Sequence, residues 1–142
     1  MIGFPGGFVD KGETLREAII REVKEEVNFK FDSEMLQEEI TIEMEGLNTH
    51  LFSIEVDNNV LIHIQKDIIN SLHYEEEIVG SKLIYLTSFD ENKGLVNTLK
   101  TPMPKSAIEE FSYLILNRKL MNSTLYHKVL KDSGYDLNNL LI

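Results

Sequence analysis

The spacing of hydrophobic positions predicts both helices and strands in this chain. Apolar residues recur at helical spacing over 14–27 and again over 106–120, which predicts two amphipathic helices. Their apolar faces consist of Ile19, Ile20, Val23 and Val27 in the first helix and of Ile108, Phe111, Leu114 and Ile115 in the second. Shorter helices are predicted near Asn97 and over 125–131, and the segment 60–72 is either one helix or a strand followed by a helix.

Alternation of apolar and polar residues predicts a strand over 38–44, and strands are also expected over 51–56 and 82–86. A further short strand is expected over 1–4, and the Asp-Asn-Asn run at 57–59 predicts a turn. No repeat or low-complexity linker interrupts these elements. We therefore expect a single α/β domain over the whole chain of 142 residues.

The first predicted helix has a capping signal and an acidic face. Thr14 followed by Glu17 is the pattern of a capping box at a helix start. At about 100° per residue, Glu22, Glu25 and Glu26 fall on one arc beside the apolar arc. Like charges at this spacing destabilise a helix. A bound Mg²⁺ or Mn²⁺ would relieve the repulsion among these glutamates, because such hard cations take oxygen ligands. The alternative is an acidic helix face that is only solvated.

The segment 7–29 resembles the Nudix box, G-x5-E-x7-R-E-U-x-E-E-x-G-U, in which U is a bulky apolar residue. The positions in register are Gly7, Glu13, Arg21, Glu22, Val23, Glu25, Glu26 and Phe29. Asn28 stands where the pattern has Gly. This position follows the helix, where a left-handed backbone is expected, and Asn is the residue other than Gly that is found there. We therefore expect the departure to leave the metal ligands in place.

Resemblance to the Nudix superfamily implies a fold and a chemistry. The fold is an α/β/α sandwich with a mixed sheet, and we expect this chain to lack the strands that usually precede the box. The activity is metal-dependent hydrolysis of a nucleoside diphosphate linked to a further group, with Glu22, Glu25 and Glu26 as metal ligands and catalytic carboxylates. Arg21 is expected to pair with Glu13 or Glu25 and to fix the loop on the helix.

A longer match within the superfamily indicates the substrate. The lead-in at 3–10, the run at 76–80 and the start of the last long helix resemble snoRNA-decapping enzymes that also hydrolyse inosine diphosphates. The resemblance implies that Gly6 lies at the metal and the substrate, and that Gly7 both shapes the box and borders the substrate. It also implies that Glu77 adds a catalytic carboxylate from a loop, for which a solvated acidic loop is the alternative.

Two further side chains are candidates for the substrate pocket. Phe4 could stack on a base, although an aromatic residue at its spacing is more often part of a core. The histidines His50, His63, His73 and His127 have no metal-ligand spacing. Of these we retain only His50, in a predicted strand, as a pocket residue, and we expect the others to be ordinary.

The overall charge narrows the partners. The formal net charge is −10, and the chain has no cluster of Lys and Arg, which argues against a broad nucleic-acid-binding surface. A nucleotide or one capped RNA end remains compatible, because metal can offset the local charge. No apolar run approaches the roughly 20 residues of a membrane span. The chain has no cysteine, which is compatible with an intracellular protein of the nucleus or cytoplasm.

Three hypotheses follow from these features. The first is a Nudix hydrolase acting on IDP, dIDP or the diphosphate linkage of a capped RNA. The second is a catalytically impaired Nudix domain that acts as a nucleotide- or RNA-binding scaffold. The third is a fragment that is inactive without further strands or a second copy of itself, because missing strands would expose sheet edges. A homodimer is therefore among the expected states.

Overall fold

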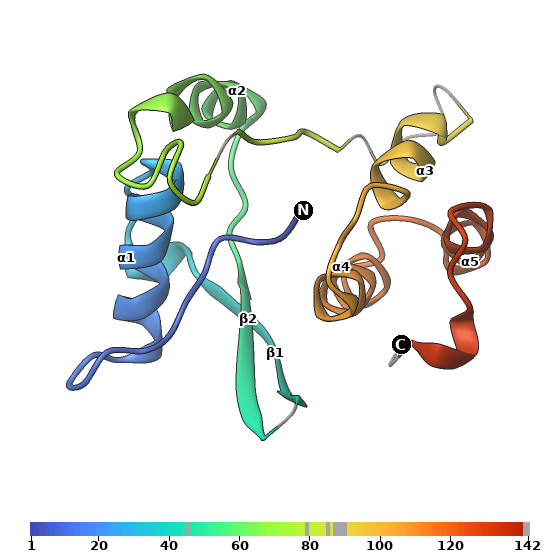
Figure 1. Ribbon diagram of the computed structural model, residues 1–142, viewed down its shortest axis with the longest axis horizontal. Helices are drawn as coiled ribbons and strands as arrows, with labels where there is room; N and C mark the ends of the chain where they lie inside the picture. The colour runs from blue at the N-terminus through green and yellow to red at the C-terminus, as the bar shows by residue number, and fades with distance from the viewer. Residues whose placement is uncertain (45, 79, 85, 87–90, 141–142) are drawn as a thin grey trace. The chain divides into compact units, whose positions relative to one another are not determined.

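The computed structural model describes residues 1–142 except 45, 79, 85, 87–90 and 141–142 (Figure 1). The chain divides into two compact units. One is Pro5–Leu83, and the other combines Met1–Phe4 with Ile84–Ile142. We call them the box unit and the helical unit.

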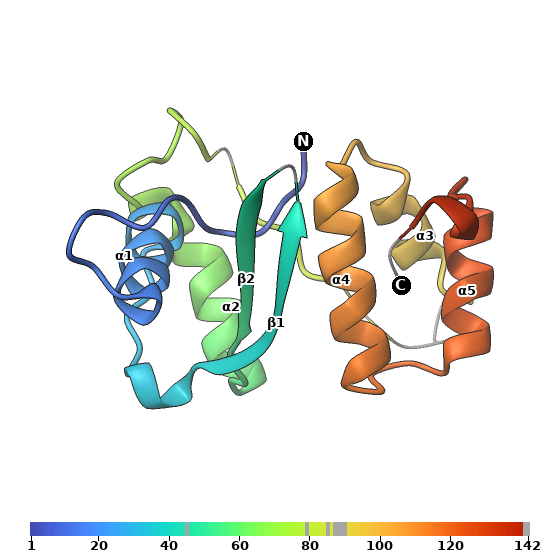
Figure 2. The same ribbon diagram turned by 90° about the horizontal axis from the view of Figure 1, so that it is seen from below.

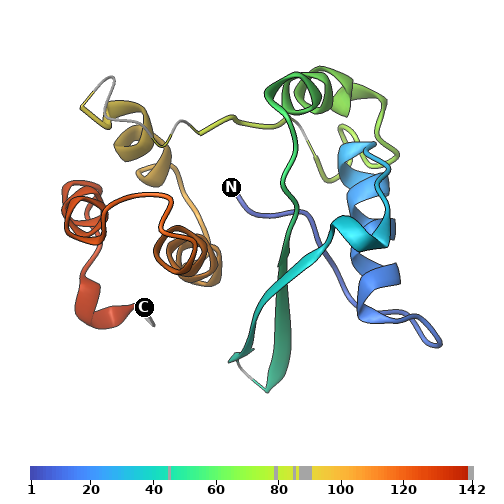
Figure 3. The ribbon, with the colours of Figure 1, turned by 180° about the vertical axis from the view of Figure 1, so that it is seen from behind.

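The box unit contains two helices and a hairpin of two strands. Its elements are α1 (Leu15–Val27), the 3₁₀ turn η1 (Ser33–Met35), β1 (Gln37–Met44), β2 (Leu47–Ser53), α2 (Asn58–Asp67) and the 3₁₀ turn η2 (Ile68–Asn70). The strands pair antiparallel in the two-stranded sheet of the described residues. The twisted ribbon they form is clearest when the molecule is seen from behind (Figure 3).

Helix α1 begins and ends where the sequence predicts. The Thr14 side chain accepts a hydrogen bond from the Glu17 amide at 3.2 Å, and the Glu17 carboxylate accepts one from the Thr14 amide at 2.8 Å. The capping box is therefore complete. At the other end Asn28 has φ 56° and ψ 32°, the left-handed conformation expected at the box position that usually holds Gly.

The β-hairpin is held in register by a tight turn. Met44 pairs with Leu47 at the turn and Gln37 with Ser53 at the open end, with an irregularity between Glu38 and Ile40. Gly46 has φ 79°, a conformation that Gly adopts without steric cost. The second strand, β2 (Leu47–Ser53), begins and ends earlier than the predicted range of 51–56.

The interior of the box unit is small. Among its described residues, the buried apolar side chains are Ala18, Leu36, Leu51 and Ile68. The predicted apolar arc of α1 is only half-buried, and the buried positions of that helix are Ala18 and Glu26. A hairpin of two strands has little apolar surface with which to cover a helix. The box unit consequently keeps an acidic side chain among its most buried groups.

The helical unit is built from three helices. They are α3 (Lys93–Leu99), α4 (Lys105–Asn117) and α5 (Ser123–Asp132), followed by the 3₁₀ turn η4 (Leu137–Asn139). Figure 2 shows α4 and α5 lengthwise with α3 between them. Their shared core consists of Leu95, Leu99, Ile108, Phe111, Ile115, Tyr126, Val129 and Leu130. Three of the four predicted core residues of the long helix are in this core, and Leu114 is half-buried.

Polar contacts tie this core together. Tyr126 is fully buried and its hydroxyl lies 2.9 Å from Ser112 Oγ, and burial raises the pKa of Tyr126 to about 12. The Tyr135 hydroxyl donates to the Leu99 carbonyl at 2.7 Å. The N-terminal residues join the same unit, because the Ile2 amide donates to the Pro102 carbonyl at 3.0 Å.

The α/β class is confirmed, and so are the helices predicted over 14–27, 106–120 and 125–131. The helix alternative for 60–72 is correct, although α2 begins at Asn58 and gives way to η2. The predicted turn at 57–59 is wrong, because Asp57 is instead the N-cap of α2. Asp and Asn favour helix caps as well as turns, so the pattern did not distinguish them.

Two predicted strands are absent from the described residues. Residues 1–4 are not a strand, since their described backbone contact is the single bond from Ile2. Residues 82–84 and 86 are not in a strand either, and residue 85 lies outside the described part of the chain. Ile84 and Leu86 pack against the helical core instead. In both segments the apolar residues were identified correctly, but a strand also requires a neighbour to pair with.

Candidate active site

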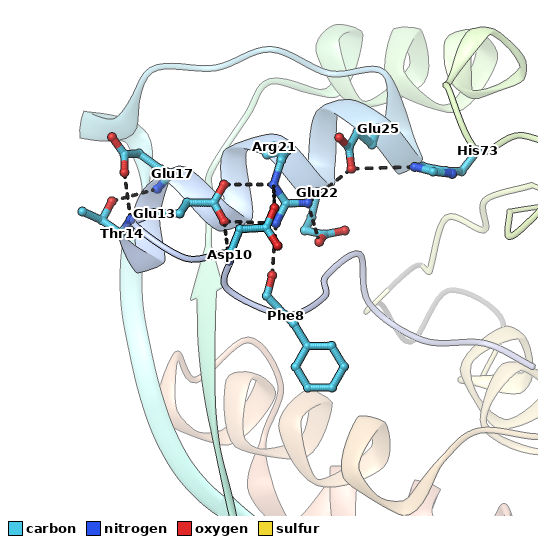
Figure 4. Close-up of polar contacts among 9 residues, drawn as sticks. All are labelled: Phe8, Asp10, Glu13, Thr14, Glu17, Arg21, Glu22, Glu25 and His73. Carbon is cyan, nitrogen blue, oxygen red and sulfur yellow. Dashed lines mark hydrogen bonds and ion pairs between the residues drawn. The ribbon is translucent and has the colours of Figure 1, made fainter.

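Arg21 of α1 holds the loop that precedes the helix (Figure 4). Its Nε and Nη2 donate to the two oxygens of Glu13 at 2.9 and 3.1 Å, and Nη2 also donates to the Phe8 carbonyl at 3.0 Å. The Asp10 amide donates to Glu13 at 3.0 Å. The Arg21 guanidinium lowers the pKa of Glu13, so this carboxylate stays ionised. The pairing of Arg21 with Glu13 that the sequence predicts is therefore present.

The same guanidinium reaches the acidic face of the helix. Nη1 of Arg21 donates to Glu22 Oε1 at 2.7 Å and to Glu25 Oε2 at 3.3 Å. The hydrogen bonds that Arg21 donates to Glu13 and Glu22 raise the pKa of Arg21 above its ordinary value. Arg21 thus orients two of the three glutamates while it anchors the loop.

Gly7 lies against the carboxylate of Glu22. A Cβ added at Gly7 would overlap this group, standing 2.7 Å from its Cδ and 3.0 Å from Oε2. The box glycine is therefore explained by a close approach of backbone to carboxylate. Gly7 precedes Glu22 by 15 residues in the sequence, and its lack of a side chain leaves room for the Glu22 carboxylate.

Glu26 is the most buried of the three glutamates, with 9% of its surface exposed. Its Oε2 accepts a hydrogen bond from the Gly6 amide at 3.1 Å. Burial raises the pKa of Glu26, and the charges of Glu22 and Glu77 raise it further, while the Gly6 amide and His73 act in the opposite direction. Desolvation is thus the main cause of the raised pKa of Glu26, and the nearby negative charges add to it.

Glu77 approaches the helix through His73. The Nε2 of His73 lies 3.7 Å from Glu25 Oε2, and its Nδ1 lies 3.9 Å from Glu77 Oε1. The His73 backbone amide also donates to the Glu25 carbonyl at 3.2 Å. Figure 4 shows the imidazole extending from its loop toward the Glu25 carboxylate. His73 is therefore a neighbour of both the loop carboxylate of Glu77 and the helix carboxylate of Glu25.

The donor chemistry of this cluster fits a hard divalent cation. Glu22, Glu25, Glu26 and Glu77 offer carboxylate oxygens alone, which is the ligand type that Mg²⁺ and Mn²⁺ prefer. The side chains have not converged, and no group of three or more His, Asp or Glu within the described ranges is arranged to hold a metal.

The comparison with known proteins decides the family. The model of the Nudt16-like family, described as U8 snoRNA-decapping enzyme-like, matches residues 1–121. The chain belongs to the Nudt16-like family. A U8 snoRNA-decapping enzyme of Homalodisca vitripennis is 30% identical over 107 residues, which cover 71% of this chain and 57% of that protein. The chain thus spans a little over half the length of that Nudt16-like relative.

Two predicted pocket residues have other described partners in this Nudt16-like chain. His50 lies opposite Thr41 in the hairpin, and its Nδ1 is 2.8 Å from Thr41 Oγ1. Phe4 belongs to the helical unit, where it stacks on Phe111 at 6.4 Å between ring centroids. The described contacts join neither residue to the box glutamates. Both assignments to the substrate stay predictions.

His73 is the residue of this site that the sequence did not single out. It was set aside with the other histidines because no metal-ligand spacing involves it. The available signal was its place four residues before Glu77, the i,i+4 separation at which side chains can meet. Its approach to Glu25 depends on how the loop folds back onto α1, which a local pattern does not encode.

One hollow of the box unit lies away from Glu22, Glu25, Glu26 and Glu77. It measures about 690 Å³ and shares only Arg21 with the cluster. Its lining is completed by Glu17, Ile20, Lys24, Lys30, Phe31, Asp32 and Met35. Since Arg21 is engaged by Glu13 and Glu22, the hollow does not add to the carboxylate site.

Among the described helices of the chain, none is long and apolar enough to span a membrane.

Proposed function

We propose that this Nudt16-like chain is a metal-dependent Nudix pyrophosphohydrolase. The observation that carries the proposal is the row of Glu22, Glu25 and Glu26 along α1, with Glu77 3.9 Å from His73, which itself lies 3.7 Å from Glu25. Three carboxylates on one helix and a fourth on a neighbouring loop concentrate negative charge. They have the chemistry of a site for a cation and a diphosphate.

Mg²⁺ or Mn²⁺ would be held by Glu22, Glu25 and Glu26, with the backbone of Gly6 beside Glu26. When bound, such a cation neutralises phosphate charge and lowers the pKa of a water molecule. Arg21 keeps Glu22 and Glu25 oriented toward one side of the helix. Fixed orientation matters because a site must be held close to its productive geometry to be effective.

Two carboxylates are candidates for the general base that accepts a proton from the attacking water. Glu26 is the most buried of the box glutamates, and it accepts a hydrogen bond from the Gly6 amide, which holds its carboxylate in place. Glu77 has a side chain 62% exposed, which gives it access to solvent. Substitutions at the two candidates for the base have different effects on the site. Replacing Glu26 removes both a metal ligand and a buried charge, whereas replacing Glu77 leaves the helix carboxylates complete.

The substrate is proposed to be an inosine diphosphate or the diphosphate linkage of a capped RNA. The name of the matched relative supports decapping, and a capped RNA would be met in the nucleus or cytoplasm. The net charge of −10 favours the smaller ligand, because a long polyanion is repelled by an acidic protein. Cleavage of capped RNA should therefore increase as salt screens this repulsion, while cleavage of a nucleoside diphosphate should change less.

Product release from a substrate panel tests the proposal. The panel contains IDP, dIDP, GDP, a capped dinucleotide and a capped RNA oligonucleotide, each with Mg²⁺, with Mn²⁺ and with EDTA. We expect release that requires metal and that disappears in Glu26→Gln. The matched control is Glu34→Gln, which removes one exposed glutamate of the same unit and should leave the rate unchanged. Equal release with EDTA, or an unchanged rate in Glu26→Gln, would refute the assignment.

A non-catalytic binding or scaffold protein is the second candidate. The observation that favours it is the absence of a converged metal group among the described residues. On this hypothesis the folded chain binds a nucleotide or capped dinucleotide but releases no product with any metal.

Size-exclusion chromatography at two protein concentrations accompanies the assay, because a chain that completes its site as a homodimer should elute earlier and turn over faster when concentrated.

A further inference from the structure

The loop that presents Glu77 is folded around one carbonyl oxygen. The amides of Glu76, Glu77 and Ile78 lie 3.2, 3.0 and 3.1 Å from the His73 carbonyl. The Glu75 amide donates to the Ile78 carbonyl at 2.6 Å, and Glu75 has φ 68°, a left-handed conformation. The position of Glu77 is therefore set relative to the backbone of His73.

His73 is in turn attached to α1 by its backbone. Its amide donates to the Glu25 carbonyl at 3.2 Å. This carbonyl lies in the last turn of the helix, where carbonyl groups have no partner within the helix. The loop thus satisfies a helix-end acceptor and is docked beside the acidic face by the same bond.

The imidazole of His73 lies between two carboxylates. Nε2 is 3.7 Å from Glu25 Oε2, and Nδ1 is 3.9 Å from Glu77 Oε1. The side chains of His73 and Glu25 are each about three-quarters buried, with 26% and 28% exposed, whereas that of Glu77 is 62% exposed. An exposed glutamate has many rotamers in solution, and a polar neighbour at fixed distance restricts them.

We propose that His73 is a positioning residue that holds the Glu77 carboxylate toward the glutamates of α1, so that Glu77 acts in the same site. The inference rests on the proposed function for its catalytic consequence. Its structural part, the coupling of His73 to Glu77, is independent of turnover. In this role His73 acts through the Glu77 carboxylate and not on the substrate directly.

A double-mutant cycle separates this role from general support of the fold. The variants are His73→Ala, Glu77→Gln and the two combined, with kcat and KM measured on the best substrate of the panel. Replacing residues that orient a ligand typically costs about 10- to 100-fold in activity or metal affinity. We expect His73→Ala to lower kcat by roughly tenfold with KM little changed, and the double variant to be no slower than Glu77→Gln. If the decrease of kcat in the double variant equals the product of the two single decreases, the proposal is overturned, because independent sites add in free energy.

Three further variants control for the size of the ring, for its polarity and for the loss of a histidine elsewhere. His73→Phe keeps a ring of similar volume without nitrogen atoms and should lose as much kcat as His73→Ala. His73→Gln restores a polar group and should recover part of the loss. His63→Ala removes an exposed histidine from α2 and should change nothing. Full activity in His73→Phe would show that the ring only fills space, and the proposal would fail.

Measurements without turnover keep this inference separate from the proposed function. Hydrogen exchange on the metal-free protein should show faster exchange of the amides of 76–78 in His73→Ala than in wild type. Calorimetric titration with Mn²⁺ should show the same non-additivity between His73→Ala and Glu77→Gln. A wild type that binds Mn²⁺ and cleaves nothing defeats the proposed function but leaves the coupling measurable. Unchanged exchange, or additive losses of Mn²⁺ affinity, defeats the positioning role itself.

Discussion

Gly7 approaches the Glu22 carboxylate so closely that no side chain fits between them. An added Cβ would stand 2.7 Å from Glu22 Cδ, within the distance at which one of the two groups must move. Glu22 cannot move freely, because its Oε1 accepts a hydrogen bond from Arg21 at 2.7 Å. The loop and the acidic face of the helix are therefore interlocked at this point.

The first prediction is that Gly7→Ala disables the site without unfolding the protein. The new methyl group displaces either the loop or the Glu22 carboxylate, and a displacement of about 1 Å at a catalytic group can cost roughly 100-fold in rate. Turnover of the best substrate and circular dichroism measure the two effects. Gly3→Ala is the matched control, because nothing lies within 4 Å of a Cβ added there. Equal activity in both variants would contradict the prediction.

The second prediction concerns the fork of Arg21. Arg21→Lys keeps the charge but cannot bind both oxygens of Glu13, Glu22 and the Phe8 carbonyl at once. The loop should loosen, and trypsin should cleave it faster after Lys11. Mass spectrometry of the first peptide released measures this. Arg16→Lys is the control, because Arg16 bonds the carbonyls of Ser33 and Leu36 rather than this loop, and cleavage at Lys11 should stay at the wild-type rate.

Local features of the site could be predicted from the sequence. The capping box of Thr14 and Glu17, the pairing of Arg21 with Glu13 and the left-handed Asn28 all involve residues within two or three helical turns. Interactions over such short separations are set by helix geometry and by the preferences of each residue type. The same reasoning located the acidic arc of α1.

Features that depend on distant partners could not be predicted. The approach of His73 to Glu25 requires the whole hairpin and α2 to return the chain to the first helix. The segment 82–86 is as apolar as a buried strand, yet Ile84 packs on a helical core. Burial of Glu26 also follows from tertiary packing, since nothing in its own segment distinguishes it from Glu22 or Glu25.

The third prediction concerns the departure from the box pattern at Asn28. The left-handed backbone there costs about 1–2 kcal/mol for a residue with an ordinary Cβ, less for Asn and nothing for Gly. Asn28 also accepts a hydrogen bond from Lys24 and donates one to Asp67 Oδ2 at 2.7 Å. Asn28→Gly should therefore lose these two bonds only, whereas Asn28→Ala should lose them and be strained as well. Urea unfolding should place Asn28→Ala below Asn28→Gly by about 1–2 kcal/mol, and the reverse order would contradict this account.

The fourth prediction is a pH dependence of stability that arises in α4 of the helical unit. Burial raises the pKa of Glu110 above its ordinary 4.5, and the charge of Glu109 raises it further. An acid whose pKa is higher in the folded state binds its proton more tightly there, so its effect on stability is most favourable below 4.5. That favourable effect is lost as pH rises from 4.5 to the raised pKa and stays constant beyond it.

Glu110→Gln removes this dependence, because a glutamine does not titrate. The melting temperature of the wild type should therefore fall relative to that of Glu110→Gln as pH rises from about 4.5 toward neutrality. Other carboxylates titrate in both proteins and cancel in the difference. Glu34→Gln controls for the loss of one negative charge at an exposed position. A difference that is constant with pH, or that favours the wild type at neutral pH, would mean that burial does not govern the ionisation of Glu110.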